Sequence, residues 1–224
     1  EIALYTLTAN DLYKKIIIVR LHDADDQIRN WSIKSLTNVI IMYDQEFFDE
    51  QRLKYIGRAL NDTSSINRLN AIKCFEKIIL HVNENTDNSQ MENDEENYFS
   101  SLTKKSNKKS KKSASSSLKI KGQNQFEDKI KNVLIEFSDM YSPRIIEMCN
   151  DSDELVAAEA ITCIGILIDQ RLIIPDDCQN IQNLISDNSQ TIRKAAANFI
   201  AKRVFFDSED NDDLDHFLSF IHEF

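Results

Sequence analysis

A short polar turn followed by an amphipathic helix recurs along this chain, and it limits the fold more than any other feature. Each turn contains an aspartate, and apolar residues follow it at helical spacing. The first two anchoring aspartates are 36 positions apart, and so are the last two. A fixed period of this size indicates repeated helical units. The four anchors are Asp26, Asp62, Asp151 and Asp187.

The apolar positions after each anchor form one stripe, so each helix has one face to bury. Only three glycines and two prolines are present, which leaves little material for the tight turns of a β-protein. The sequence therefore predicts an all-α protein, a HEAT-like α-solenoid of antiparallel helix pairs, with Trp31 as a core or inter-repeat filler. The predicted stripes are Ile28, Leu36, Val39, Ile40 and Tyr43; Ile66, Leu69, Ile72, Phe75 and Ile79; Leu155, Ile161, Ile164 and Ile168; and Ile192, Ala196, Phe199 and Ile200.

Residues 82–125 interrupt the repeats with a charged segment. Six acidic residues precede eight lysines there, and a serine-rich tract lies among the lysines. Low hydrophobicity and blocked charge predict a disordered insertion, because such a segment buries too little apolar surface to offset its ordering entropy. The expected domains are therefore repeats at 1–81, the insertion at 82–125, and further repeats at 126–224. The insertion is interpreted as a solvating linker, a nuclear import signal or a nonspecific DNA tether.

Charge and cysteine usage limit the surroundings of the protein. Outside the insertion lie 19 of the 27 basic and 31 of the 37 acidic residues, which predicts a mostly acidic folded surface. The four cysteines are far apart in the sequence, which favours buried free thiols in the cytosol or nucleus. No apolar run is long enough for a membrane span, and no secretory signal is recognised at the first residues. The chain is interpreted as a piece of a larger protein.

Catalytic interpretations find little support. The four histidines are scattered, and no metal-binding pair is evident. Asp23, Asp25 and Asp26 resemble the start of a calcium loop, but the glycine and glutamate that such a loop requires are replaced by Ile28 and Lys34. No glycine-rich phosphate loop is present. We therefore expect no enzyme, no cofactor, no metal and no small-molecule substrate.

Several runs carry a resemblance to a known family. In the first half these are Arg20–Asp23, Leu53–Gly57 with Asn61-Asp62, and Arg68-Leu69; in the second half they are Arg144–Met148, Val156–Ile161, Asp177-Cys178 and Ala195–Phe205. Their order and spacing resemble the stromalin (STAG) family of cohesin subunits. This resemblance covers most of the chain outside the insertion, and includes the conserved domain of the family.

The resemblance implies a non-catalytic scaffold subunit of cohesin, which acts in sister chromatid cohesion and chromosome segregation. Its implied partners are the kleisin subunit, regulators such as shugoshin-like proteins, and DNA bound nonspecifically. The implied location is the nucleus, in association with chromosomes.

In stromalins a groove completed by kleisin receives aromatic motifs of regulators. Lys54 agrees with the family pattern, and Glu50 and Tyr141 are mild changes from Asp and Phe. At three groove positions this sequence has other residue types where the family has a Tyr, a Trp and an Arg. These differences weaken the expectation of an aromatic ligand. The implied positions are Leu21, Glu50, Lys54, Arg58, Met140 and Tyr141. The alternative is that Glu50 and Lys54, four residues apart on one helix, form only a solvated ion pair.

Contact with DNA requires basic side chains that replace counterions on the phosphates. Three loose sets are candidates, although charges on such helices are usually only solvated. They are Lys14, Lys15 and Arg20; Arg68, Lys73 and Lys77; and Lys194, Lys202 and Arg203.

A second function class stays open from sequence, namely a HEAT-repeat adaptor of another pathway, such as a nuclear transport factor or a phosphatase scaffold. It would share the repeats but have no affinity for kleisin. The stromalin-like runs around Leu53–Gly57 and Val156–Ile161 favour the cohesin interpretation.

Overall fold

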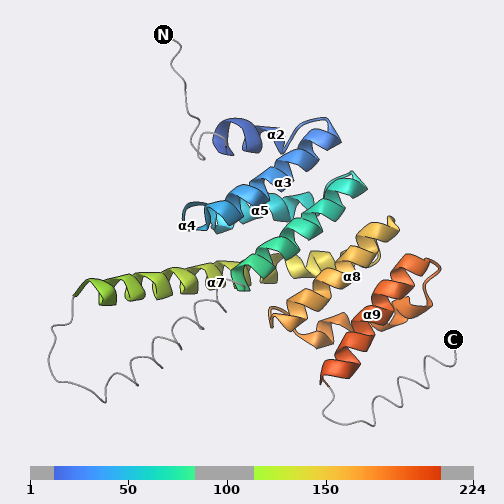
Figure 1. The fold of residues 1–224 in the computed structure, drawn as a ribbon. Helices are drawn as coiled ribbons and strands as arrows, with labels where there is room; N and C mark the ends of the chain where they lie inside the picture. Colours follow the sequence, from blue (N-terminus) through green and yellow to red (C-terminus); the bar gives the residue numbers. More distant parts are fainter. Residues whose placement is uncertain (1–12, 84–113, 208–224) are drawn as a thin grey trace, which may run out of the picture. The chain divides into compact units, whose positions relative to one another are not determined.

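The computed structural model describes residues 13–83 and 114–207 (Figure 1). No strand occurs in these ranges, so the all-α prediction is confirmed. The helices are η1 (Tyr13–Ile17, a π-helix), α2 (Ile18–Arg20), α3 (Asp26–Met42), α4 (Asp44–Phe47), α5 (Glu50–Ala59), a helix over residues 65–83, α7 (Ala114–Met148), α8 (Glu154–Asp169), η2 (Pro175–Ser186, a 3-10 helix) and α9 (Gln190–Asp207). Within the described residues, no helix combines the length and apolarity needed to cross a membrane.

The chain divides into two compact units. One comprises Glu1–Gly57 with Cys74–Phe137, and the other comprises Arg58–Lys73 with Ser138–Phe224. The division falls inside α5, the helix over 65–83 and α7, because each of these helices contributes to both units. The ranges expected from sequence instead separate at the charged insertion.

The first unit is built on α3, which contacts η1, α2 and α4. The rings of Tyr13 and Phe47 meet edge to face at 5.4 Å, and the guanidinium of Arg52 lies 4.6 Å from the Phe47 ring centroid. Phe75 and Phe137 pack with their rings 4.6 Å apart. Aromatic and cation–π contacts of this kind therefore fix the helices of this unit in addition to burying apolar surface.

In the second unit, α8 packs against α9, and both contact η2 (Figure 1). Helix α8 is the most apolar of these, and nine of its residues are buried. Pro175 begins η2, as expected from its missing N–H. Cys149 and Cys163 are buried free thiols in this unit, as Cys74 is in the other, which confirms the prediction for three of the four cysteines.

The repeated turn has a common hydrogen-bond pattern. The carboxylates of Asp23, Asp62, Asp151 and Asp187 each accept the backbone N–H two residues later, at 3.1, 2.9, 3.0 and 2.7 Å. In three copies that later residue then caps the following helix: Asp25 accepts from the N–H groups of residues 27 and 28, Asp153 from those of 155 and 156, and Ser189 from those of 191 and 192. These bonds satisfy backbone donors that a helix start leaves open.

The anchor of the first copy differs from the prediction. Asp23 makes the bond that Asp62 and Asp151 make, whereas Asp26 is already the first residue of α3. The spacing between the first two anchors is therefore 39 positions instead of 36. The stacking of these copies into a solenoid stays a prediction.

Several residues of the predicted stripes are exposed. Ile66 is 45% and Leu155 54% exposed, because each is the second residue of its helix, and the next residue turns toward the core. Ile28 and Tyr43 are 37% and 45% exposed, and Ile33, which the prediction omitted, is buried. Trp31 is 53% exposed, so its assignment to a core or inter-repeat position is wrong.

The predicted insertion agrees only in part with the helices. The helix over 65–83 includes Val82, and α7 already begins at Ala114, so both ends of the range 82–125 are helical. The prediction of disorder otherwise falls on residues 84–113, outside the described residues. Pro143 lies inside the continuous span of α7.

Candidate functional site: a partner-binding surface on α5 and basic side chains

Helix α5 presents Glu50, Lys54 and Arg58 at intervals of four residues, so they lie along one face. The Lys54 ammonium lies 2.6 Å from a Glu50 carboxylate oxygen, and the two side chains are 40% and 46% exposed. Arg58 is exposed at the end of the helix. An exposed pair of this kind adds only about 0.3–0.5 kcal/mol to stability, so it can open to meet a partner at little cost.

The other predicted groove residues have different surroundings. Leu21 is 9% exposed and belongs to the core of the first unit. Met140 on α7 is 49% exposed, and its neighbour Tyr141 is half-buried, both in the second unit. The structure thus brings together Glu50 and Lys54 in one unit, and Met140 and Tyr141 in the other.

Two of the predicted DNA contacts are held inside the second unit. The Arg68 guanidinium donates two hydrogen bonds, of 2.8 and 2.7 Å, to the Asp151 carboxylate. The Arg68 side chain is 13% exposed. Arg68 also donates to the carbonyls of residues 62 and 63. Its hydrogen bonds hold the pKa of Asp151 below its ordinary value, and this carboxylate in turn raises the pKa of Arg68.

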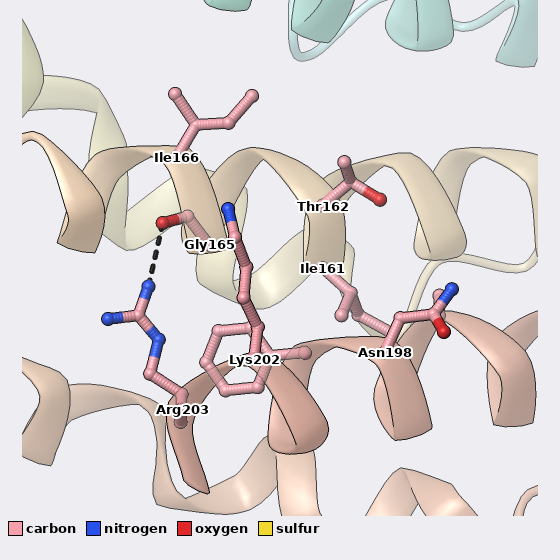
Figure 2. Close-up of a pocket in the computed structure, with 9 residues that line it drawn as sticks. Ile161, Thr162, Gly165, Ile166, Asn198, Lys202 and Arg203 are labelled. Atoms are coloured by element: carbon pink, nitrogen blue, oxygen red, sulfur yellow. Dashed lines mark hydrogen bonds between the residues drawn. The ribbon is translucent and has the colours of Figure 1, made fainter. Parts of the chain in front are cut away.

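Arg203 has a comparable structural role between α8 and α9 (Figure 2). It donates to the Gly165 carbonyl at 2.8 Å and to Asp169 at 2.6 Å, and it is 19% exposed. Lys202 donates to the other oxygen of Asp169 at 2.6 Å but is 53% exposed. Lys194 is exposed on the same helix. Arg68 and Arg203 are therefore parts of the fold, whereas the lysines face solvent.

In the first unit, Lys14, Lys15 and Arg20 are exposed on η1 and α2, with Arg20 bonded to Asp23 at 2.8 Å. Lys77 donates to the Asn38 side chain on α3 at 2.9 Å. Lys34, one turn before Asn38, completes a basic pair that the sequence analysis missed. Burial raises the pKa of the Cys74 thiol, while Thr37 and the charges of Lys34 and Lys77 act against it, so both ammonium groups lie near this cysteine.

Lys34 and Lys77 are 43 positions apart, and only the packing of α3 against the helix over 65–83 brings them together. The only sequence pattern that pointed to this pair was the i, i+4 spacing of Lys34 and Asn38, which places these two residues on one face of α3. Lys73, on the second unit, is 3.8 Å from Glu159 and 50% exposed.

Within the described residues, no group of three or more His, Cys, Asp or Glu side chains is arranged to hold a metal ion. The chain presents instead capped helices with charged faces. These features define an all-α protein with repeated capped turns and charged residues on its exposed helix faces.

Comparisons with known proteins indicate which family of helical proteins this chain resembles. Residues 22–93 match the stromalin conservative domain. The resemblance of this chain to the stromalin family is therefore confirmed. It is 22% identical over 198 residues to "Cohesin subunit SA-1" of Xenopus laevis, and 24% identical over 197 residues to "Sister-chromatid cohesion protein 3" of Arabidopsis thaliana.

The alignments cover 88% and 86% of this chain, but only 12% and 14% of these two relatives. Among solved structures, the crystal structure of an engineered protein aligns with 86% of this chain and 78% of its own, at 12% identity and a TM-score of 0.31. That score is too low to support an argument.

Proposed function

We propose that this chain is part of a non-catalytic cohesin scaffold that binds kleisin, cohesin regulators and DNA on chromosomes in the nucleus. The observation that carries this proposal is the match of residues 22–93 to the stromalin conservative domain, supported by two relatives whose names place them in cohesin or sister-chromatid cohesion. A generic helical-repeat adaptor of nuclear transport or a phosphatase has no reason to share this match.

The partner contact is proposed on α5. Lys54 is half-exposed and pairs only weakly with Glu50, so its ammonium is available to a partner. A carboxylate of a partner peptide can replace Glu50 as the acceptor, while Arg58 extends the basic face by one turn. In the second unit, Met140 and Tyr141 are proposed as a contact of their own, with apolar and aromatic surface for an anchor side chain.

The test is calorimetric titration of the chain with overlapping peptides from the middle region of the kleisin of the same organism. We expect one peptide to bind with micromolar or tighter affinity, and Lys54→Glu to weaken it about tenfold, because the substitution places a like charge opposite the peptide carboxylate.

Lys129→Glu is the matched control, since Lys129 is an exposed lysine on α7 outside all the proposed contacts. Equal weakening by both substitutions would show a general charge effect and would count against a site on α5. If no kleisin peptide binds while circular dichroism shows a folded helical chain, the proposal that this part of the protein binds kleisin is wrong.

A DNA contact is proposed at Lys34 and Lys77 of the first unit. Two ammonium groups on adjacent helices, one of them bonded to Asn38, can neutralise neighbouring phosphates. Arg68 and Arg203 are left out of this proposal, because their guanidinium groups already bind Asp151 and Asp169.

A further inference from the structure

The second unit contains a pocket between α8 and α9 that the proposed contacts on α5 and at Lys34 and Lys77 do not use (Figure 2). Its volume is about 180 Å³. Pockets for drug-sized ligands and cofactors are larger, about 300–1,000 Å³. The pocket is therefore of a size for one inserted side chain. Its lining is Ile161, Thr162, Gly165 and Ile166 from α8, and Ala195, Asn198, Phe199, Lys202 and Arg203 from α9.

Gly165 of α8 lines the pocket without a side chain of its own. A Cβ added at Gly165 would lie 3.6 Å from Phe199, an ordinary contact distance, so Phe199 borders the pocket directly beside Gly165. Ile161 and Phe199 make the neighbouring wall apolar. Arg203 bonds the Gly165 carbonyl at 2.8 Å and stacks 5.6 Å from the Phe199 ring centroid, which fixes the two helices on either side. The apolar wall favours a hydrocarbon side chain over a phosphate group.

The mouth of the pocket is polar and basic. Thr162 and Asn198 are exposed and carry groups that can bond a peptide backbone, since the Thr162 hydroxyl donates to the Ala158 carbonyl and its oxygen can still accept. Lys202 and Arg203 share the single carboxylate of Asp169, which leaves one positive charge over. Lys194 lies eight residues before Lys202, two turns earlier on α9.

The other charged residues around the pocket leave its local charge positive. Glu159, one turn before Thr162 on α8, is 3.8 Å from Lys73. Glu154, at the start of α8, accepts a hydrogen bond from Ser189 just before α9. Four cations thus stand against three carboxylates, in a chain whose net charge is -10. A local excess of positive charge on an acidic protein attracts an acidic partner and repels other copies of the same chain.

We propose that this pocket receives one aliphatic side chain of an acidic peptide segment of a partner protein, with the flanking carboxylates meeting Lys202 and Lys194. The segment crosses α8 and α9 at the level of Thr162 and Asn198, and the aliphatic anchor enters above Gly165. The apolar wall provides the affinity for the anchor, and the lysines select acidic flanks.

The test uses isoleucine-methyl NMR of the chain, because Ile161 and Ile166 line the pocket and report its occupation even at millimolar affinity. The probes are three synthetic nine-residue peptides: four acidic residues on each side of a central leucine, the same peptide with a central serine, and the leucine peptide with lysine flanks. We expect shifts of both methyl signals with the acidic leucine peptide, and affinities at least about fivefold weaker for the other two.

Substitutions in and around the pocket test whether the methyl shifts come from a peptide bound there. Gly165→Leu fills the pocket, and Thr162→Phe, at an exposed position, covers its mouth without altering the core; both should abolish the shifts. Gly165→Ala adds only a Cβ at an ordinary contact distance, so it controls for the change of helix propensity at this position. Lys202→Glu should weaken binding about fivefold or more, and Lys129→Glu should not.

The proposal is wrong if none of the peptides shifts the methyl signals, if lysine-flanked and acidic peptides bind equally, or if binding persists in Thr162→Phe. Shifts caused by a short DNA duplex but by no peptide would assign the face to nucleic acid instead. Because the test uses neither kleisin nor α5, its failure leaves the proposed cohesin function untouched.

Discussion

At the scale of single residues, the pair of Arg68 and Asp151 joins two parts of the sequence that are far apart. Its two bonds of 2.8 and 2.7 Å join residues 83 positions apart, and the Asp151 side chain is 6% exposed. The same carboxylate also accepts the N–H of Asp153 at the start of α8. One carboxylate thus joins the helix over 65–83 to the turn before α8.

Arg68→Ala should lower the free energy of unfolding by about 3 kcal/mol, because it leaves the Asp151 charge buried without its guanidinium. Arg193→Ala is the matched control: Arg193 donates to the carbonyls of residues 187 and 188, as Arg68 does to those of 62 and 63. Loss of the Arg193 side chain should lower the free energy of unfolding by about 1 kcal/mol. Urea unfolding measures both. Equal losses would mean that the contact with Asp151 adds nothing.

The Asp151 carboxylate also predicts a dependence of stability on pH. The Arg68 hydrogen bonds lower its pKa in the folded protein, so the unfolded chain binds the proton more tightly. The contribution of Asp151 to the free energy of unfolding is complete at pH values above its pKa in the unfolded chain, about 3.9. It is lost as the pH falls through the lower pKa of Asp151 in the folded protein. Asp23 and Asp153 have lowered pKa values too and act in the same direction.

Urea unfolding between pH 3 and pH 7 should therefore show a decline in stability at acid pH that is less steep in Asp151→Asn, which has no carboxyl at this position to titrate. An unchanged slope in this variant would contradict the assignment.

At the scale of elements, the caps decide where helices begin. Asp153 accepts the first N–H groups of α8 at 3.0 and 3.4 Å, and a hydrogen bond from Ser65 is the main cause of its lowered pKa. The carboxylate thus both ends the turn and joins it to the neighbouring helix. Directly after the cap, Leu155 is exposed and Val156 is buried, so the buried face of α8 begins at Val156.

Asp153→Ala should destabilise the protein by about 1 kcal/mol or more, through loss of the cap and of the bond from Ser65. Asp153→Ser should restore part of this loss, since Ser189 caps α9 in the same way. Asp139→Ala, at an exposed position inside α7, is the control. Thermal unfolding followed by circular dichroism compares the three variants. The cap has no role if Ala and Ser are equivalent at 153.

At the scale of the whole molecule, charge governs association. A chain with a net charge of -10 repels DNA at long range, so any DNA contact depends on local basic groups. Lys34 and Lys77 form such a group because two helices of the first unit bring them together.

Fluorescence anisotropy with a labelled DNA duplex should show binding that weakens steeply with salt. The double variant Lys34→Gln/Lys77→Gln should bind more weakly and reduce the slope of log K against log salt by about 1.8, as for two lost phosphate contacts. Lys129→Gln should leave the slope unchanged. A slope that is the same in all three proteins would exclude Lys34 and Lys77 as phosphate contacts.

The sequence by itself determined the all-α class, because few glycines and prolines and stripes at helical spacing leave no other way to bury apolar surface. The repeated aspartate turns were also visible, since a cap is a local interaction between residues close in the chain. Local pattern was insufficient at Asp26, where three candidate aspartates lie within four positions and only the hydrogen bonds select Asp23. The stromalin resemblance was recognised from the order and spacing of several runs, among them Leu53–Gly57 and Val156–Ile161.

Only the tertiary structure decided what each charged side chain does. Arg68, Lys77 and Arg203 look alike in sequence, yet Arg68 holds Asp151, Arg203 bonds Gly165 and Asp169, and Lys77 faces solvent beside Asn38. The same holds for the exposure of Trp31 and for the pocket at Gly165. The physical reason is that the partners lie on other helices: a side chain's role depends on which face of a neighbouring helix it meets, and that is fixed by packing.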